Sequence, residues 1–588
     1  MQLRPAQHRR VARTVLGLLV PLLVAVGPAA QARAAPDAPP ETTVAVDAGH
    51  PLGPVNGNLL GFAFDRRIDQ PGFAPLPART FRLDVGFQDI VACPQGTMRA
   101  DRLADLQQRL DEIEAAGAEA ILILTYMPPC LADTFPGDPR DPTHLPPRDP
   151  AAWQRLVSEL VTATGPGRAA SGHRPVRYYE VWNEPDWFFF EASQAQFTTN
   201  VLVPSGRAVA DVAKSSGLDL RFGVCGCLFA DGSWMIPLMT EARAAGIPVG
   251  FVSWHYYGNY PFIGPDGVEP LFPKQSAPVV SLLGRRNPAA SPQSYLIQLD
   301  QVRTWAQATL GRVPELMVDE WNLSAGGFDK RMDTNEGAAF QTATLAALAS
   351  DGLDRALLFS AVDPYDRDID GNTLPARYGG WGVVDRFLAR KPAWYGQWMW
   401  SRLQGSRLAS PQDPAGGVWT AASTSKERAD VLVSSFEATG ASGRGLHLDV
   451  AGLKPGRWTA TLFRVDADHP GSTDPAETVD LMAGPSGHAV LDTGLPPQSV
   501  VLVELARPAE RAVSVAGEQF LRADRVAAGP GASSLPATGG TTPPAVGLIA
   551  VAAALAGRRY RRRRLGRAER AAGGSSGGAG RDPSCTAS

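Results

Sequence analysis

Two glutamates end runs of apolar and aromatic residues that are predicted to be buried strands. Glu184 closes the run 176–184 and is followed by Pro185, which cannot continue a central ladder of strands. Glu320 lies near the end of a second run, 316–322. A carboxyl group at a strand end, beside an amide and among tryptophans, is typical of a site that does chemistry.

Strand alternation orients the second glutamate. Successive side chains of a strand point to opposite faces, so Glu320 shares a face with Leu316 and Val318. We therefore expect Glu320 to point into a cleft. Asp319 has the opposite parity, and we expect it to be a surface or helix-facing partner.

Two carboxyl groups that face each other can cut a glycosidic bond with retention of configuration. One protonates the leaving oxygen while the other attacks the anomeric carbon. Such pairs lie about 5 to 5.5 Å apart, whereas inverting pairs are wider because a water must fit between them. The eight histidines show no HExxH or similar spacing and there is no CxxC pair, so we expect no metal site and no cofactor.

The chain around these glutamates alternates strand-like and helix-like runs, which favours an α/β architecture. Eight strands, each followed by a helix or a long loop, predict a parallel (β/α)8 TIM barrel over 42–404. Insertions at 258–292 and 363–390 follow the sixth and eighth strands, where barrel enzymes shape their substrate clefts. The predicted strands are 59–64, 80–85, 120–126, 176–184, 220–227, 250–257, 316–322 and 356–362. The predicted helices lie near 103–113, 153–161, 232–245, 291–310, 335–350 and 392–403.

Beyond the barrel, short β runs are separated by Gly, Pro and Asp, which predicts a β-sandwich over 405–508. The early run 43–46 is a strand that can pair with this sandwich. Residues 509–534 show no core pattern and are predicted to be a linker or stalk. The predicted sandwich strands are 418–422, 430–435, 447–450, 458–465 and 500–505.

The first residues have the pattern of an export signal. Within 1–35, four arginines precede the apolar run 15–26, and small residues at 30–34 offer a cleavage site. Residues 1–35 are therefore predicted to be a signal peptide, and we expect the protein to be extracellular.

Residues 535–564 resemble the cell-wall sorting signal of Gram-positive bacteria. The pentapeptide LPATG is followed by an apolar stretch, 543–557, and then by a cluster of arginines. In such signals a sortase cleaves between the residues that correspond to Thr538 and Gly539 and joins the threonine to peptidoglycan. The apolar stretch is shorter than the roughly 20 residues of a full span, so we expect transient membrane insertion; a simple membrane anchor is the alternative. Residues 565–588 are predicted to be a disordered tail.

The formal net charge of −3 hides an uneven distribution. Residues 1–35 hold five arginines, and 555–588 hold nine arginines against two acids. The remainder, 36–554, therefore has 42 basic and 57 acidic residues. An exported segment this acidic is a poor nucleic-acid binder, so we expect no nucleic-acid partner and interpret the basic tail as a topology signal.

Five cysteines are too few for a disulfide scaffold in a chain of 588 residues. Cys93 and Cys130 each follow a predicted strand, so they can form a bridge between neighbouring loops in an oxidising compartment. Cys225 and Cys227 lie two positions apart on a strand-like run, where a bridge would be strained.

Six short segments match one family in order and spacing. They are FRLD at 81–84, EVWNEP at 180–185, WHYY at 254–257, DEW at 319–321, GGWG at 379–382 and KPAWY at 391–395. Together they resemble glycoside hydrolase family 39, the family of β-xylosidases and α-L-iduronidase. The resemblance covers about residues 42–505. It implies that Glu184 is the acid/base and Glu320 the nucleophile, on strands four and seven of the barrel.

The resemblance also implies contacts with a sugar. Asn183 is expected to hold the 2-hydroxyl, although an amide that caps a turn would give the same pattern. His255 and Tyr257 share a strand face and are expected at the substrate, with the tyrosine hydrogen-bonded to the nucleophile. Trp187 and Trp381 are candidates to stack on sugar faces, although large aromatic residues more often serve packing.

Two further acidic residues complete the predicted site. Asp363, just after the eighth strand, is a candidate ligand for a sugar hydroxyl; an ordinary Asp-Pro turn is the alternative. Glu180 shares the strand parity of Glu184 but lies deeper in the barrel, where a lone charge would be costly. We predict that Glu180 pairs with Arg82 and supports the site without doing chemistry.

The expected substrate is a plant or microbial polysaccharide or oligosaccharide. The sequence leaves two alternatives: a carbohydrate-binding surface protein that has lost turnover, and an endo-acting exopolysaccharide hydrolase of a related family. Xylose, glucose, arabinose and uronic acids all occur as substrates among relatives, and the predicted cleft residues show no evident basic cluster for a carboxylated sugar.

Overall fold

The computed structural model describes residues 41–63, 76–258, 292–325, 329–363, 380–437 and 442–507. Within these residues no helix is long and apolar enough to cross a membrane. Outside them lie the predicted signal peptide (1–35), stalk (509–534), sorting signal (535–564) and tail (565–588), together with most of both long insertions.

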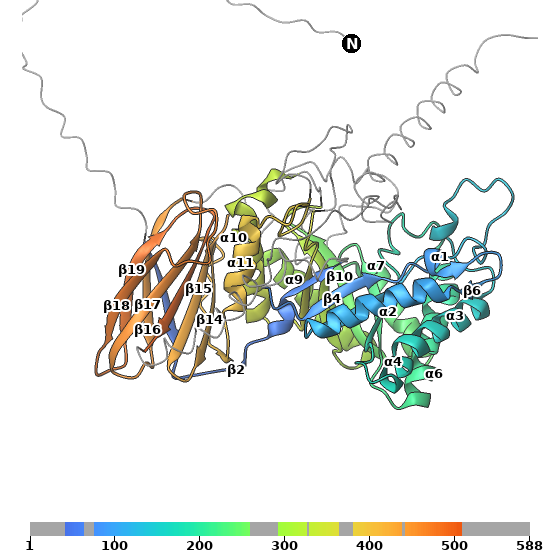
Figure 1. The fold of residues 1–588 in the computed structure, drawn as a ribbon, viewed down its shortest axis with the longest axis horizontal. Coiled ribbons are helices and arrows are strands. Elements are labelled where there is room, and N and C mark those ends of the chain that lie inside the picture. The colour runs from blue at the N-terminus through green and yellow to red at the C-terminus, as the bar shows by residue number, and fades with distance from the viewer. Residues whose placement is uncertain are drawn as a thin grey trace, which may run out of the picture. The chain divides into compact units, whose positions relative to one another are not determined.

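Eight parallel strands close into a barrel, as predicted. Two of them are labelled in Figure 1, β4 (Thr80–Asp84) and β10 (Val249–Tyr257). Both faces of these strands are buried, which explains their nearly continuous apolar sequences. Closure is made by only two residue pairs, Leu357 with Gly61 and Leu358 with Phe62. In order around the barrel, the strands are β3 (Gly61–Ala63), β4 (Thr80–Asp84), β7 (Glu119–Leu124), β8 (Tyr178–Val181), β9 (Arg221–Cys227), β10 (Val249–Tyr257), β11 (Glu315–Asn322) and β12 (Arg355–Leu358).

Helices alternate with these strands along the chain, and all six predicted helices are present. An additional helix, α6, was not predicted, because Pro204, Ser205 and Gly206 interrupt the expected pattern of helix-forming residues. Proline is well tolerated in the first turn, and Gly206 lets the helix approach Ile247, whose side chain leaves no room for a Cβ. The main helices are α2 (Ala100–Ala115), α3 (Pro150–Thr164), α6 (Val203–Ser216), α7 (Gly232–Ala244), α9 (Pro292–Leu310), α10 (Asn335–Ser350) and α11 (Pro392–Ser401). Shorter helices are α1 (Phe87–Ile90), α4 (Pro166–Ala170) and α5 (Gln194–Phe197).

The second part of the fold consists of two β-sheets, which agrees with the predicted sandwich. All five predicted sandwich strands are present, and β18 and β19 were not predicted. One sheet has the order β1 (Glu41–Asp47), β16 (Arg444–Ala451), β19 (Ala489–Leu495). The other has the order β18 (Glu477–Ala483), β17 (Gly456–Val465), β20 (Ser499–Ala506), β15 (Arg428–Ser435), β14 (Val418–Ser425), β13 (Ser406–Arg407), β2 (Gly53–Pro54).

The first strand of the described chain belongs to the sandwich rather than to the barrel. β1 pairs in parallel with β16, and Val44 lies opposite Leu448. This confirms the predicted pairing of residues 43–46. Val44 and Val46 are buried in the core between the sheets.

Helix α10 packs against sandwich strands. Phe340 of the helix meets Phe436 edge-on, with ring centroids 5.1 Å apart. Ser434 of β15 donates a hydrogen bond to the Thr342 hydroxyl at 2.7 Å. Twelve of the sixteen residues of α10 are buried, because one side faces the barrel and another faces the sheet.

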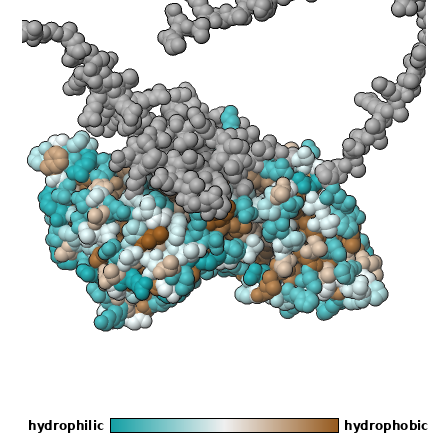
Figure 2. Space-filling view, turned by 180° about the vertical axis from the view of Figure 1, so that it is seen from behind, coloured by the Kyte–Doolittle hydropathy of each residue, from teal (hydrophilic) through white to brown (hydrophobic). Residues whose placement is uncertain are grey.

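The described surface is largely hydrophilic, as Figure 2 shows for one face. Large hydrophobic side chains that are exposed come from separate loops, strands and one helix of the barrel and the sandwich. They are Leu52, Phe135, Ile236, Val313, Phe387, Met482 and Val490. The apolar surface is therefore dispersed rather than gathered on one element.

Two disulfides occur in the described chain. The bridge between Cys93 and Cys130 confirms that the loops after β4 and β7 are joined. A second bridge, between Cys225 and Cys227, was not expected. The physical reason is the backbone of β9: Cys225 has a φ of 105° and Gly226 a φ of 55°, which shortens the Cα separation of the two cysteines to 4.9 Å. That distance lies in the range that a disulfide requires.

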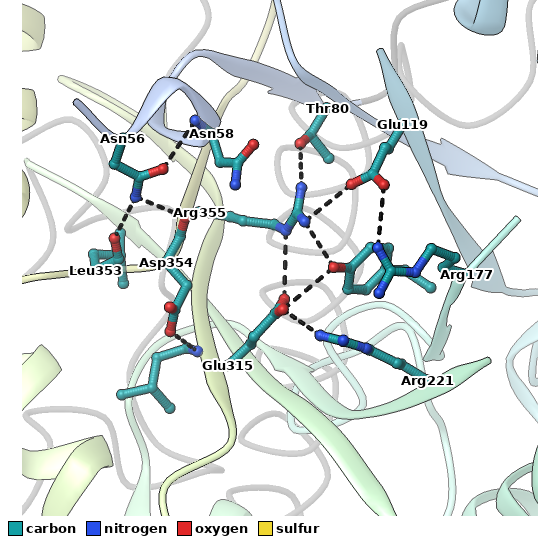
Figure 3. Close-up of polar contacts among 12 residues, drawn as sticks. Asn56, Asn58, Thr80, Glu119, Arg177, Arg221, Glu315, Leu353, Asp354 and Arg355 are labelled. Carbon is teal, nitrogen blue, oxygen red and sulfur yellow. Dashed lines mark hydrogen bonds and ion pairs between the residues drawn. The ribbon is translucent and has the colours of Figure 1, made fainter. Parts of the chain in front are cut away.

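Arg355, the first residue of β12, closes the amino-terminal end of the barrel (Figure 3). Its guanidinium donates to Thr80 at 2.8 Å and to Glu119 at 3.0 Å. It also donates to the Tyr178 hydroxyl at 2.6 Å and lies 3.5 Å from a Glu315 oxygen. These partners are the first residues of four other strands, so one side chain links five strands of the barrel.

Replacing Arg355 by Met is expected to lower the free energy of unfolding by about 2 kcal/mol, between the values for exposed and buried ion pairs. The acids Glu119 and Glu315 would lose their most buried partner, although each is about a quarter exposed and reaches solvent. Urea unfolding followed by tryptophan fluorescence measures the effect.

Arg177 is the matched control at the same end of the barrel. It pairs with Glu119 and Asp219, but its side chain is 34% exposed. Arg177→Ala is therefore expected to cost less than about 1 kcal/mol. Equal losses for the two variants would contradict the central role of Arg355.

Candidate active site

The chain turns sharply at the carboxyl end of β8, and this turn carries Glu184. The strand ends at Val181, and both Trp182 and Glu184 have positive φ angles, of 63° and 45°. Such angles are costly for residues with a side chain. The turn is held by the Glu184 N–H, which donates to the Gly226 carbonyl of β9 at 2.8 Å. Glu184 is left buried at the strand ends, 3% exposed.

The structure brings Glu184 and Glu320 together. One carboxylate oxygen of each lies within 4.8 Å of the other, and a ring nitrogen of His255 lies within the same distance of both. Glu320 is 2% exposed and belongs to β11. This close approach favours a narrow carboxylate pair of about 5 to 5.5 Å over the water-filled gap of about 6.5 Å or more.

Arg82 on β4 orients several side chains of the site. Its Nε donates to Glu180 Oε2 at 2.6 Å, so the predicted pair of Arg82 and Glu180 is present. Its Nη1 donates to Glu320 Oε2 at 3.3 Å. Its Nη2 donates to Asn183 Oδ1 at 3.0 Å. A single fully buried guanidinium thus fixes groups from β8, the turn after it and β11.

Strand β10 supplies one partner for each glutamate. The Tyr257 hydroxyl donates to Glu320 Oε1 at 2.6 Å, as expected for this strand face. His255 Nδ1 lies 2.8 Å from Glu184 Oε1. His255 is fully buried, and burial together with the Arg82 charge holds its pKa well below the ordinary value. The imidazole is therefore neutral.

Burial raises the pKa of both glutamates, but to different extents. It raises the pKa of Glu184 well above the ordinary value, and the Glu320 and Asp186 carboxyl groups raise it further. It raises the pKa of Glu320 to about 7, against the opposing effects of Arg82 and of the Tyr257 hydrogen bond. Glu184 thus keeps its proton at a pH where Glu320 is ionised.

The prediction that Asp319 is a surface or helix-facing partner is wrong. Its side chain is completely buried, with Oδ2 3.3 Å from Arg82 Nε and Oδ1 3.8 Å from His255 Nε2. The reason is a β-bulge: β10 pairs Trp254 with Val318 but the next residue, His255, with Glu320. A bulge interrupts the alternation of faces, so Asp319 and Glu320 both reach the inside of the barrel.

Asp363 lies in a buried ion pair. Lys391 Nζ donates to Asp363 Oδ1 at 2.6 Å, and the Gly382 N–H donates to the same oxygen at 2.8 Å. The Asp363 side chain is completely buried, and burial raises its pKa to about 6 despite Lys391. The structure therefore gives Asp363 a buried ion-pair partner in Lys391, and its contact with a sugar hydroxyl stays a prediction.

The two predicted stacking tryptophans differ. Trp381 is 1% exposed, donates to the Ser324 carbonyl at 2.9 Å and packs edge-on against Phe359, so it serves packing. Trp187 is half-buried, three residues after Glu184, with its ring against Phe188 at 4.3 Å. Of the two tryptophans, only Trp187 keeps exposed surface.

Two residues of the site were not predicted. Ser253 donates its hydroxyl proton to Glu180 Oε1 and accepts from the Gly226 N–H at 3.1 Å. Tyr126 is buried beside Asn183. Ser253 precedes His255 and Tyr257 at a spacing of two, and this parity could have pointed to it. Tyr126 follows the end of β7 and carries no such pattern.

The donor atoms of Glu184, His255 and Glu320 are close enough together to surround a divalent cation. The positive guanidinium of Arg82, 3.3 Å from Glu320, opposes a second cation at this position. The Glu320 oxygens also already accept hydrogen bonds from Tyr257 and Arg82. The geometry therefore favours a pair of carboxyl groups over a metal site.

No family model matches the sequence, and no curated protein matches it. Solved structures are similar in fold. A monomeric β-xylosidase from Caulobacter crescentus CB15 has a TM-score of 0.61 at 20% identity, over 79% of this chain and 99% of that one. A family 39 glycoside hydrolase from Xanthomonas axonopodis pv. citri has a TM-score of 0.61 at 18% identity, over 80% and 97%. The chain has the fold of a family 39 glycoside hydrolase.

A third structure with this family 39 fold is described as a bacterial orthologue of human α-L-iduronidase. Its TM-score is 0.57 at 14% identity, over 79% of this chain and 84% of that one. The similarity in all three covers about four fifths of this chain.

Proposed function

We propose that the protein is a retaining glycoside hydrolase in which Glu184 is the acid/base and Glu320 the nucleophile. The observation that carries the proposal is the close approach of the two carboxyl groups, with one oxygen of each within 4.8 Å of the other, because a retaining mechanism needs a narrow pair. The glycosidase fold supports a carbohydrate as the substrate.

In the first step the Glu320 carboxylate attacks the anomeric carbon, and the bond from that carbon to the leaving oxygen breaks. Glu184 gives its proton to the leaving oxygen. Its Oε1 lies against His255 Nδ1, whereas Oε2 has no partner among the described residues, so Oε2 is the oxygen that carries the proton. Asn183 accepts from Arg82 through Oδ1, which leaves its NH2 group to donate to a sugar hydroxyl.

In the second step water attacks the anomeric carbon and releases Glu320. The negative charge on Glu320 is lost while it is bound to the sugar, so the pKa of Glu184 falls and the group accepts a proton from the water. Tyr257 and Arg82 stabilise the Glu320 carboxylate as it leaves. These hydrogen bonds favour hydrolysis of the intermediate.

A bell-shaped pH profile of kcat/KM is expected from this pair. Activity should fall as the pH drops below about 7, the pKa of Glu320, because the protonated nucleophile cannot attack. It should also fall at higher pH as Glu184 loses its proton, because no acid is left for the leaving oxygen. Initial rates on an aryl glycoside over a range of pH measure both limbs, and an activity that rises steadily toward acid pH would contradict the assignment.

Tyr257→Phe is expected to move the acid limb of this profile to higher pH. The Tyr257 hydroxyl donates to Glu320, and a hydrogen bond to a charged group is worth about 1.5 to 3 kcal/mol. Its loss should raise the pKa of Glu320 by about one to two units, at 1.36 kcal/mol per unit. Tyr256→Phe is the matched control. Tyr256 is also buried, but its side chain points to the opposite face of β10 from that of Tyr257. An unmoved acid limb in Tyr257→Phe would show that the tyrosine does not act on the nucleophile.

The test of the proposed function is the release of sugar from a panel of aryl glycosides, with NMR of the first sugar formed. Xylose, glucose, arabinose and a uronic acid cover the sugars expected from the sequence. Release with retained anomeric configuration is the expected result. Inversion would contradict the mechanism, and affinity without release would favour the carbohydrate-binding alternative.

We further propose that the protein is exported and attached to a cell wall of the Gram-positive type. The support is the order LPATG, apolar stretch and arginine cluster within 535–564, together with the leader at 1–35. Treatment with a sortase and a glycine-rich acceptor peptide should yield a product joined at Thr538, which mass spectrometry can identify. Thr538→Ala should prevent the reaction, and an unaltered reaction would contradict the sorting signal.

A further inference from the structure

Three buried carboxyl groups surround the single guanidinium of Arg82. The side chains of Glu180 and Asp319 are completely buried, and that of Glu320 is 2% exposed. One positive charge cannot balance three negative charges where water does not reach them. At least one of the three acids must therefore carry a proton.

The hydrogen bonds of Glu180 identify it as an ionised group. Oε2 accepts the Nε hydrogen of Arg82 at 2.6 Å, and Oε1 accepts the hydroxyl hydrogen of Ser253. Hydrogen bonds to both oxygens stabilise the charged form of a carboxylate. These two hydrogen bonds thus stabilise Glu180 as a carboxylate.

Asp319 has the opposite surroundings. Its Oδ2 lies 3.3 Å from Arg82 Nε, but that nitrogen has one hydrogen, which is directed at Glu180. Its Oδ1 lies 3.8 Å from His255 Nε2, too far for a hydrogen bond. Neither oxygen accepts a hydrogen bond from a donor among the described residues.

The remaining polar neighbour of Asp319 is the Glu180 carboxyl group, which raises the pKa of Asp319. Ionised carboxylates only accept hydrogen bonds, so a bond between two carboxyl groups requires a proton on one of them. Glu180 already accepts from two donors, and the proton therefore belongs to Asp319.

We propose that Asp319 is a positioning residue that carries a proton and donates it to the ionised Glu180, which leaves Glu180 and Glu320 as the two anions on Arg82. The titratable groups that face Asp319 are Arg82 from β4, Glu180 from β8, His255 from β10 and Glu320 from β11. Burial raises the pKa of Asp319 well above its ordinary value, and Glu180 raises it further, in agreement with this assignment.

The proton on Asp319 sets the net charge of the site. With neutral His255 and protonated Glu184, the two anions and Arg82 leave one net negative charge. A single negative charge faces the positive charge that develops on the sugar ring in the transition state. This consequence rests on the proposed function, whereas the location of the proton does not.

Two isosteric variants on the same guanidinium test the assignment. Asp319→Asn keeps a neutral donor at 319, whereas Glu180→Gln removes the charge that Arg82 needs. Infrared spectra at about pH 8, far above the ordinary carboxyl pKa of about 4, should show the band of a protonated carboxyl group. Asp319→Asn should remove this band, whereas a proton held by Glu180 or Glu320 would leave it in place. Glu184 adds a second such band, which Glu184→Gln identifies.

Stability and the pH profile give two further readouts. The unfolding midpoint of Asp319→Asn should stay at or above that of the wild type at about pH 8, and Glu180→Gln should lower it, since a neutral acid tolerates a neutral replacement. On an aryl glycoside, the acid limb should stay in place for Asp319→Asn and move to lower pH for Glu180→Gln, because the Glu180 charge raises the pKa of Glu320.

The reverse pattern would overturn the proposal. Retention of the band in Asp319→Asn, or a variant at 319 that fails to fold while Glu180→Gln folds, would place the negative charge on Asp319 instead. The infrared and unfolding measurements need no substrate. If no aryl glycoside is hydrolysed, they still decide where the proton lies, and only the proposed function fails.

Discussion

Glu320→Ala is expected to reduce hydrolysis of an activated aryl glycoside by about 10⁴- to 10⁶-fold, the loss found when nucleophiles or their partners are removed from other hydrolases. Without this carboxylate no covalent intermediate can form. Added azide fits the space that the carboxylate leaves and attacks the same face of the sugar. The product should be a glycosyl azide of inverted anomeric configuration, which NMR identifies.

Glu184→Ala is the matched control for this experiment. It removes the acid but keeps the nucleophile, so substrates with good leaving groups should still form the intermediate. Azide should then attack the intermediate and give a glycosyl azide of retained configuration. Wild-type rates of hydrolysis by Glu320→Ala without azide would contradict the assignment of Glu320 as the nucleophile.

Arg82→Met is expected to lower the free energy of unfolding by about 3 to 5 kcal/mol, the usual loss when one partner of a buried ion pair is removed. Methionine fills a similar space without charge, so Glu180 and Glu320 would remain buried without a counter-ion. Arg82 lowers the pKa of Glu320 in the folded protein, and its loss raises that pKa further. Urea unfolding at several pH values measures the effect.

The sign of the pH dependence follows from this shift. A folded pKa above the unfolded value of about 4.3 costs stability only where the unfolded chain has released its proton. The deficit of Arg82→Met should therefore be small in acid and grow as the pH rises toward the folded pKa. A deficit that is the same at every pH would contradict the electrostatic explanation.

Arg82→Lys separates charge from geometry. Lysine keeps the positive charge but lacks the planar fork that reaches Glu180, Glu320 and Asn183 in three directions. We expect most of the stability to return, while kcat/KM stays about 10- to 100-fold below that of the wild type, the equivalent of one lost charged hydrogen bond. Wild-type kinetics in this variant would show that the fork is not required.

The strand ends could be predicted from the sequence because apolar runs and breakers mark them. Glu184 before Pro185 and Glu320 within 316–322 lie at the mouth of the barrel for this reason. The barrel itself was predicted from the number of strands, but the close packing at its closing strand β3 could not be, since it depends on Gly61. A Cβ at this position would lie 3.0 Å from the backbone oxygens of Thr80 and Ala356, so glycine lets the neighbouring strands approach.

The errors in the site have a common origin. The alternation of side chains along a strand assigns Asp319 to the wrong face. The bulge that changes this cannot be recognised in the pattern of apolar residues. Asp363 appears free in the sequence because its partner, Lys391, comes 28 positions later. The turn at Glu184 depends on the Gly226 carbonyl of another strand. Each of these features is a long-range contact, which local sequence patterns do not encode.

The place of β1 in the sandwich means that the sandwich is built from both sides of the barrel in the chain. The strand before the barrel pairs along its full length with β16, which comes after the barrel. A recombination junction between barrel and sandwich would leave β16 and β19 as a two-stranded sheet, which is marginal in water, and would uncover Leu448 and Val450. An exchange of the sandwich for that of another protein would therefore have to replace β1 together with the strands that follow the barrel.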